Sequence, residues 1–227
     1  MKKILSYFTK TELTIWLCSI TFILGSFLIF DRGSYLTLAA SLMGATALIF
    51  CAKGNPIGMT IMVVFCIFYG YIAWTFRYYG ELMTYVFMSL PMSLFSLVSW
   101  LKNPYKGKVS EVAIRKLSRK DILTMVFSTV AVTVIFYFVL AYFGTANLIP
   151  STFSVATSFF AVFLMSKRSP YFALAYAAND VVLIVLWVLA SITDRSYISV
   201  VICFITFLVN DIYSFINWKR MQKKQEN

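Results

Sequence analysis

Histidine is absent from this 227-residue chain, and charged side chains are scarce. Without an imidazole the chain has no histidine metal ligand, no serine–histidine triad and no histidine proton relay. Only 13% of the residues are charged, whereas soluble domains carry roughly 25%. Because 60% of the residues are hydrophobic and 18% are aromatic, so few charges cannot cover a soluble fold of this size. The composition predicts a membrane protein.

Cysteines and sequence motifs for catalysis are equally sparse. None of the four cysteines forms a C-x-x-C pair, so we expect small buried thiols and neither a zinc site nor a redox motif. The chain has no aspartate-rich diphosphate motif and no P-loop. We therefore expect no cofactor, no metal and no enzymatic activity. The cysteines are Cys18, Cys51, Cys66 and Cys203.

Hydrophobic runs take up most of the chain. A membrane-spanning helix needs about 20 apolar residues, and eight segments qualify. The sixth is polar for a membrane span, because it carries several serines and threonines. The first segment is long for a signal peptide and no cleavage site follows it, so we interpret it as a retained helix. The predicted spans are 13–30, 34–52, 56–76, 82–101, 122–143, 148–166, 170–192 and 196–216.

The basic residues segregate when these eight spans are threaded through a membrane. With the N-terminus inside, 17 of the 20 lysines and arginines fall on the inner side, and only Arg32, Arg77 and Arg195 fall outside. The positive-inside rule therefore predicts both termini in the cytoplasm. The same rule explains the net charge of +11, because the basic side chains gather on one side of the lipid bilayer. We therefore expect the bilayer as a partner and no nucleic acid.

Two parts of the chain resemble each other. The segment ending at Trp100 aligns with the segment ending at Trp218 at an offset of 118 residues, and upstream, with a slip of four residues, Lys53 aligns with Lys167. Two parallel three-helix repeats with a linker helix are a transporter architecture. The predicted organisation is an N-terminal helix in 1–33, a first repeat in 34–103, a basic loop and linker helix in 104–147, a second repeat in 148–220 and a cytoplasmic tail in 221–227.

Two acids lie well inside spans, and each follows an asparagine. Asp180 and Asp211 have no lysine or arginine partner within any span. An ionisable group at that depth is a functional candidate by default, although polar groups also hydrogen-bond helices together. Amides and carboxylates suit ligand hydroxyls, and a carboxylate beside aromatic faces suits a cation. The candidate substrate-binding residues are Ser93, Ser96, Trp100, Tyr176, Asn179, Asp180, Trp187, Asn210, Asp211, Tyr213, Phe215 and Trp218.

The segment from Asn210 to Lys219 resembles the Asn-x-x-Tyr-Gly-Trp-x-x-Trp ending of PnuC-type nicotinamide riboside transporters. The segment from Leu90 to Pro104 resembles the mid-chain copy in the same family, with Ser93 in place of the asparagine and Ser96 in place of the glycine. The similarity extends over about residues 34–220 and includes the segments Tyr78–Glu81 and Met165–Arg168. Phe95 and Phe215 stand near the family's tryptophan positions, which is a departure from its pattern.

The resemblance implies a SWEET-like 3+1+3 helix core with one extra N-terminal helix, assembled as a homotrimer. It also implies facilitated diffusion of nicotinamide riboside or a related vitamin or nucleoside, which an intracellular kinase then traps. Relatives assigned to thiamine, riboflavin or deoxynucleosides leave the substrate open. A second alternative is a substrate-binding membrane subunit of a larger transport complex.

The site hypothesis distributes three roles. Asn179 and Asn210 would hold hydroxyl or amide groups of the ligand, and Asp180 and Asp211 would pair with a pyridinium or thiazolium charge. The aromatic side chains would stack on the ring or enclose it: Tyr176, Tyr213, Phe215, Trp187 and Trp218.

Overall fold

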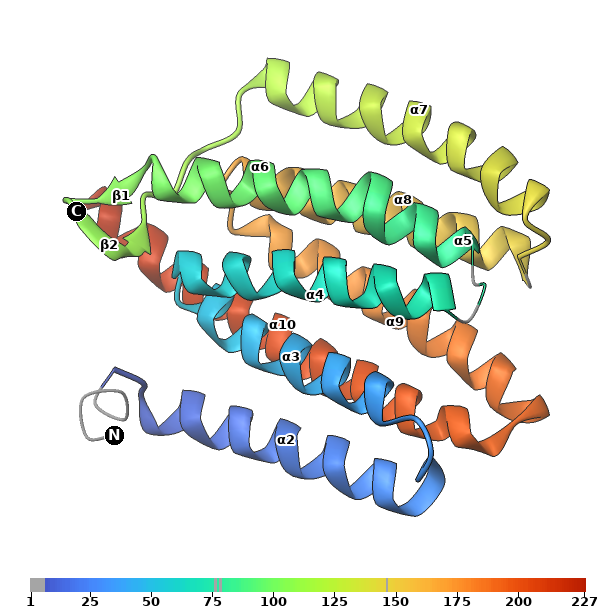
Figure 1. Ribbon diagram of the computed structural model, residues 1–227. Coiled ribbons are helices and arrows are strands. Elements are labelled where there is room, and N and C mark those ends of the chain that lie inside the picture. The colour runs from blue at the N-terminus through green and yellow to red at the C-terminus, as the bar shows by residue number, and fades with distance from the viewer. Residues whose placement is uncertain (1–6, 76, 78, 146) are drawn as a thin grey trace.

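The computed structural model describes residues 7–75, 77, 79–145 and 147–227, which form a bundle of long helices (Figure 1). Lys2, Lys3 and Tyr78, used in the arguments above, lie outside the described residues. In chain order the elements are α2 (Lys10–Phe30), α3 (Tyr35–Ala52), α4 (Pro56–Thr75), α5 (Tyr79–Leu82), the π-helix η1 (Met83–Ser89), α6 (Leu90–Leu101), β1 (Pro104–Tyr105), β2 (Lys108–Val112), α7 (Arg119–Tyr142), α8 (Leu148–Ser166), α9 (Tyr171–Thr193), the 3₁₀-helix η2 (Arg195–Tyr197) and α10 (Ile198–Glu226).

The all-α membrane fold is confirmed. Within the described residues, eight helical segments are long and apolar enough to cross a membrane, and their bounds follow the predicted spans closely. Three details differ from the sequence-based expectation. The fourth span is divided into α5, η1 and α6, the basic loop forms a two-stranded antiparallel hairpin, and α10 continues through most of the segment expected as a tail.

Six of the helices form a closed circle, which we call the core bundle. Helix α3 packs against α4, α4 against α6, α6 against α8, α8 against α9, α9 against α10, and α10 returns to α3. Each of these helices therefore has one face turned toward the centre of the circle. Residues three, four and seven positions apart share a helix face, so a polar or aromatic series at that spacing lines the centre together.

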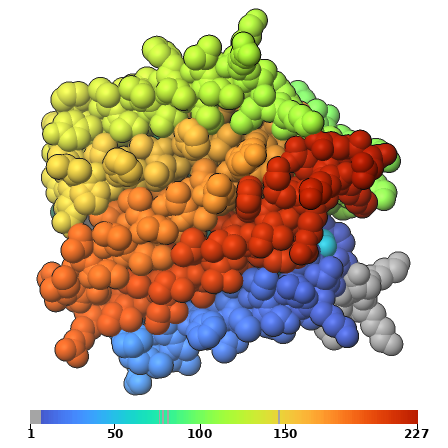
Figure 2. Space-filling model, turned by 180° about the vertical axis from the view of Figure 1, so that it is seen from behind, coloured from blue at the N-terminus to red at the C-terminus, as the bar shows by residue number. Residues whose placement is uncertain are grey.

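The two remaining long helices lie outside the core bundle. Helix α2 packs on α3 and α10, and α7 packs on α8 along the other side (Figure 1). Figure 2 shows α10 crossing the rear face between α9 and α2. On α7 the side chains of Leu123, Phe127 and Tyr142 are more than two thirds exposed. Such a helix is stable in lipid, where apolar side chains need no protein cover.

One end of the bundle carries the start of α2, the hairpin and the end of α10 (left in Figure 1), and we call it the basic end. Two helices begin there with a capping box, Thr9 with Glu12 and Ser118 with Asp121. Two others, α3 and α8, end there in left-handed residues, Gly54 at φ +64° and Arg168 at φ +57°. Both closures satisfy backbone groups that a helix end leaves unpaired.

Candidate functional site

An aromatic layer closes the centre of the core bundle near the basic end. Trp100 of α6 and Trp218 of α10 are fully buried, and their rings lie 5.4 Å apart. Trp100 Nε1 donates to the carbonyl of Met165 at 3.0 Å, and Trp218 Nε1 donates to the carbonyl of Cys51 at 2.9 Å. Phe172 of α9 packs against both indoles, with centroids 6.4 and 4.8 Å away.

A layer of hydroxyl groups follows one turn further into the bundle. Ser96 lies four residues before Trp100, and Ser214 lies four residues before Trp218, so each serine shares the inward face of its helix. Both side chains are buried, and neither Oγ has a hydrogen-bond partner in the part of the chain that the structure describes. A buried hydroxyl without a partner is costly, and it points to water or a ligand at this level.

An acidic layer lies seven residues from the tryptophans, about 10 Å along the helices. Asp180 of α9 and Asp211 of α10 are 4% and 2% exposed, and their carboxyl groups interact directly with each other. Asp180 Oδ2 and Asp211 Oδ1 have no hydrogen-bond partner among the described residues. Across the centre, Ser93 Oγ of α6 lies 3.9 Å from Cys66 Sγ of α4.

Two candidate residues of α9 adjoin this acidic layer. The partly buried Tyr176 lies one turn before Asp180 and is close enough to interact electrostatically with both carboxyl groups. Asn179 is buried against α8, where its Oδ1 accepts hydrogen bonds from Thr157 Oγ1 at 2.7 Å and Ser158 Oγ at 3.1 Å. A threonine and a serine among the polar residues of α8 therefore hold this asparagine in place.

The other candidates contact elements outside the centre. Asn210 Nδ2 donates to Ser19 Oγ of α2 at 2.8 Å, and Tyr213 Oη donates to Glu12 Oε1 of α2 at 3.2 Å. The Phe215 ring packs on Tyr171, at 6.0 Å, and the Trp187 ring packs on Tyr197, at 5.2 Å, toward the end opposite the basic end. The structure thus leaves Asn210, Tyr213, Phe215 and Trp187 away from the centre of the core bundle. The candidates that it gathers around the centre are Asp180, Asp211, Tyr176, Ser93, Ser96, Trp100 and Trp218.

Helix α10 explains the separation. Its sequence offers polar residues all round, so helical spacing alone does not single out one inward face. In the structure the face with Asp211, Ser214 and Trp218 turns inward, while Asn210 and Tyr213 turn toward α2. Periodicity alone does not say which face meets which neighbour, because α10 packs against three long helices.

Some residues of the site had no place in the sequence argument. Phe172 completes the aromatic layer, and Cys66 is the neighbour of Ser93. Only Cys66 can be read from the internal alignment, since the offset of 118 pairs Ser93 with Asp211 and the slipped offset of 114 pairs Cys66 with Asp180, whereas Phe172 pairs with Gly58. Cysteine counts as a small hydrophobe in composition, which hides its place in a polar layer.

The fourth span is irregular just beside the acidic layer. Residues Met83–Ser89 form the π-helix η1, and the N–H of Leu90 donates to the carbonyl of Tyr85. Pro91 follows and supplies no N–H to the helix. A π-helical turn is frequent at functional sites and breaks the regular helix. This irregularity gives the fourth span a place to bend two residues before Ser93.

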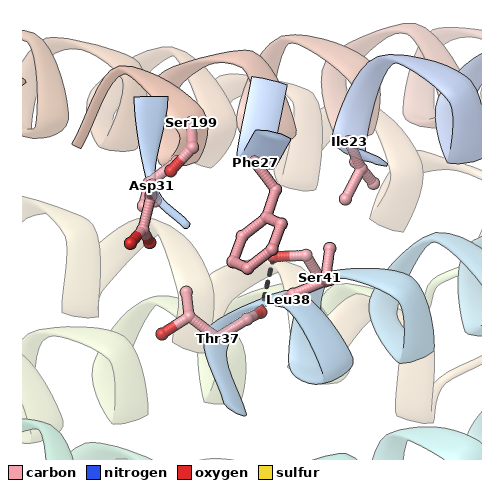
Figure 3. A pocket seen from close by; sticks show the side chains of 8 residues that line it. Ile23, Phe27, Asp31, Thr37, Leu38, Ser41 and Ser199 are labelled. Carbon is pink, nitrogen blue, oxygen red and sulfur yellow. Dashed lines mark hydrogen bonds between the residues drawn. The ribbon is translucent and has the colours of Figure 1, made fainter. Parts of the chain in front are cut away.

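The small cavities lie away from the layered centre. Figure 3 shows one of about 10 Å³ between α2, α3 and the start of α10, lined in part by Phe27, Asp31 and Ser41. This volume holds about one water molecule. A cleft of about 360 Å³ lies at the basic end between the hairpin and α10, beside Tyr105 and Gln225. The buried polar centre coincides with neither space.

Membrane-length helices arranged in a circle around a buried, layered polar centre define the class: a polytopic membrane transporter rather than a soluble enzyme. The chain belongs to the nicotinamide mononucleotide transporter family, whose model matches residues 34–220. The match spans the segment that the sequence resemblance covers.

Individual relatives agree with this assignment. The nicotinamide riboside transporter PnuC of Neisseria mucosa is 23% identical over 214 residues, covering 92% of this chain and 81% of that protein. The protein of the same name from Haemophilus influenzae is 23% identical over 192 residues, covering 84% and 82%. A crystal structure of the vitamin B3 transporter PnuC shares the fold, with a TM-score of 0.80, 22% identity and coverage of 96% and 94%. These relatives are named as transporters, as expected for a protein that is not an enzyme.

Proposed function

We propose that this chain carries nicotinamide riboside, or a closely related vitamin or nucleoside, into the cell by facilitated diffusion, and that an intracellular kinase traps the product. Its place would be the bacterial inner membrane, with both termini in the cytoplasm. The concentration of basic side chains at one end of the bundle supports that orientation. The printed names of the two curated relatives support the substrate class.

The observation that carries the proposal is the order of layers along the centre of the core bundle. The aromatic layer of Trp100, Trp218 and Phe172 offers ring stacking. The next two layers along the same column offer hydrogen bonding, from two serine hydroxyls without a described partner, and negative charge, from the acidic layer. A nucleoside with a flat base and a hydroxylated sugar needs these three contacts. We assign base and sugar contacts to Tyr176, Asn179, Ser93, Ser96 and the two tryptophans.

We also propose that the core bundle is a duplicated three-helix unit that works by rocking one half against the other. Matching hydrogen bonds support the duplication. Trp100 binds Met165 as Trp218 binds Cys51, and Ser99 Oγ donates to the carbonyl of Ser166 as Asn217 Nδ2 donates to that of Ala52, both at 2.8 Å. Each pair follows the offsets of 118 and 114 residues found in the sequence.

In the rocking motion, the aromatic layer would close the transport path on the cytoplasmic side, at the basic end. Its two indole hydrogen bonds join α6 to α8 and α10 to α3, which are the two seams between the halves. Opening the basic end requires both to separate. The wide exposed apolar surface of α7 supports the proposed homotrimer, in which α7 would meet a neighbouring protomer.

Reconstitution tests the function. Purified protein in liposomes should admit labelled nicotinamide riboside saturably, and unlabelled nicotinamide riboside should compete better than thiamine, riboflavin, thymidine or uridine. Liposomes without protein set the background. Saturable entry blocked only by one of the other compounds would move the assignment to that compound. Binding without entry would contradict facilitated diffusion and favour a subunit that needs a transport complex.

Two asparagine substitutions separate ligand contact from packing. Asn179→Ala should raise the KM of uptake at least several-fold, because it removes a buried amide beside the acidic layer. Asn217→Ala is the matched control, since it removes a partly buried amide that binds the carbonyl of Ala52 at the basic end. It should lower thermal stability and leave the KM unchanged. Equal effects on the KM would contradict the role of Asn179.

A further inference from the structure

The Asp180–Asp211 pair is the most unusual electrostatic feature of the core bundle. The two carboxyl groups are almost completely buried, they interact directly, and each keeps one oxygen without a partner in the described structure. Two adjacent carboxylates in such a place cannot both be ionised, because each repels the charge of the other in a medium that screens poorly.

The surrounding helices supply no positive charge. The titratable groups that interact with the pair are Tyr176 on α9, Cys51 on α3 and Cys203 on α10, and the thiol of Cys66 on α4 interacts with Tyr176. On α2 the buried Glu12 is already paired with Lys53, at 2.9 Å. The nearest basic residue along α10 is Lys219, eight residues from Asp211 and about 12 Å along the helix. No described salt bridge involves either aspartate.

The opposite side of the centre is neutral at the same level. The positions aligned with Asp180 and Asp211 are Cys66 and Ser93, which also lie close together, at 3.9 Å. The column is therefore acidic on the α9–α10 side and uncharged on the α4–α6 side. The unpartnered hydroxyl of Ser214 shares the inward face of Asp211, and that of Ser96 shares the inward face of Ser93. Together with one oxygen of Asp180 and one of Asp211, these hydroxyls make four buried oxygens that have no partner among the described residues. They lie on both sides of the centre, which favours a bound ligand between them.

We propose that Asp180 and Asp211 share one proton, present a single negative charge to the centre and make the site selective for a monovalent heteroaromatic cation. The cationic ring lies toward α9 and α10, and the neutral, hydroxyl-bearing part lies toward Ser96 and Ser93. This inference rests on the proposed function, because it takes the centre of the core bundle as the path of the transported molecule.

Asparagine substitutions test the charge, because an amide replaces a protonated carboxyl group without a change of shape. Asp180→Asn and Asp211→Asn should each keep one carboxylate and bind nicotinamide riboside within a few-fold of the unchanged protein. The double variant Asp180→Asn/Asp211→Asn should lose at least about 30-fold in affinity for the cation. Its affinity for the uncharged dihydro form of nicotinamide riboside should not fall in parallel.

Glu12→Gln is the matched control. It also removes a fully buried carboxylate, but one that Lys53 neutralises, so it should lower stability and leave the preference for the cation unchanged. The proposal is overturned if the double variant binds the cation as the unchanged protein does. It is equally overturned if either single variant loses as much affinity as the double variant, since that would require two ionised carboxylates.

Infrared difference spectroscopy with nicotinamide riboside bound supplies a second readout, which reports the proton itself. The unchanged protein and Glu12→Gln should show the carbonyl band of a buried protonated carboxylic acid, and both single aspartate variants should lack it. Absence of the band from the unchanged protein overturns the shared proton. If thiamine, another monovalent cation, binds in place of nicotinamide riboside and the double variant loses it, the substrate assignment fails and the charge selection stands.

Discussion

Trp100 and Trp218 hold each other at the centre of the bundle: their rings lie 5.4 Å apart, and each indole N–H binds a carbonyl at the end of a helix across a seam. Met165 and Cys51, which accept these bonds, also accept the N–H of Arg168 and Gly54 at 2.9 Å. Each indole thus reinforces the left-handed closure of a helix end. This arrangement makes the aromatic layer both a packing core and a lock on the basic end.

The two indole hydrogen bonds should have similar energies. Trp100→Phe and Trp218→Phe should each lower the free energy of unfolding by at least about 1 kcal/mol, because one hydrogen bond is lost and the smaller ring leaves a cavity in a fully buried layer. The double variant should deviate from additivity, since the rings touch. Thermal unfolding in detergent measures all three. A loss confined to one single variant would contradict the equivalence of the two bonds.

The Glu12–Lys53 ion pair should control the attachment of α2. Glu12 is 1% exposed and lies 2.9 Å from Lys53 Nζ, so Lys53→Met leaves an unpaired buried carboxylate. We expect a loss of about 3–5 kcal/mol in the free energy of unfolding.

Removing the second charge should reverse much of this loss. The double variant Glu12→Gln/Lys53→Met has no buried charge left at this position and should recover part of the stability in the same unfolding measurement. If the double variant is no more stable than Lys53→Met, the loss comes from the packing of the lysine stem and not from the unpaired charge.

Gly58 is required by the close approach of α4 to α3. A Cβ at this position would lie 2.7 Å from Cys51 N and 2.8 Å from the carbonyl oxygen of Ala47, and backbone atoms cannot give way as a flexible side chain does. Gly58→Ala should destabilise the protein by about 1–3 kcal/mol. Gly25→Ala is the control, because nothing lies within 4 Å of its Cβ position in α2. It should be neutral or stabilising in the same thermal unfolding assay.

Pro91 should matter for movement more than for binding. Pro91→Ala restores a backbone N–H next to the π-helix Met83–Ser89 and favours a regular helix there. We expect a several-fold slower uptake with an unchanged Kd, measured in liposomes and by titration. Pro150→Ala is the control, because Pro150 lies in the first turn of α8, where a helix tolerates proline. Equal uptake rates for both variants would contradict a bending role for the fourth span.

The sequence predicted the helices well because a membrane simplifies the problem. A span must be apolar over about 20 residues, so hydropathy alone located α3 and α8 to within about one residue of their ends. The fourth span was an exception, since the π-helix depends on how residues 83–89 pack and not on their hydropathy. The small hairpin at Pro104–Val112 was also missed, because its residues carry charges typical of a loop.

The sequence by itself determined the class of protein, the number of spans, the family and the presence of two acids without a basic partner in any span. Only the tertiary structure decided that Asp180 and Asp211 meet, that Cys66 meets Ser93, and that Asn210 and Tyr213 turn to α2. The physical reason is that each helix carries polar residues on several faces, and side-chain packing between neighbouring helices selects which of those faces points to the centre.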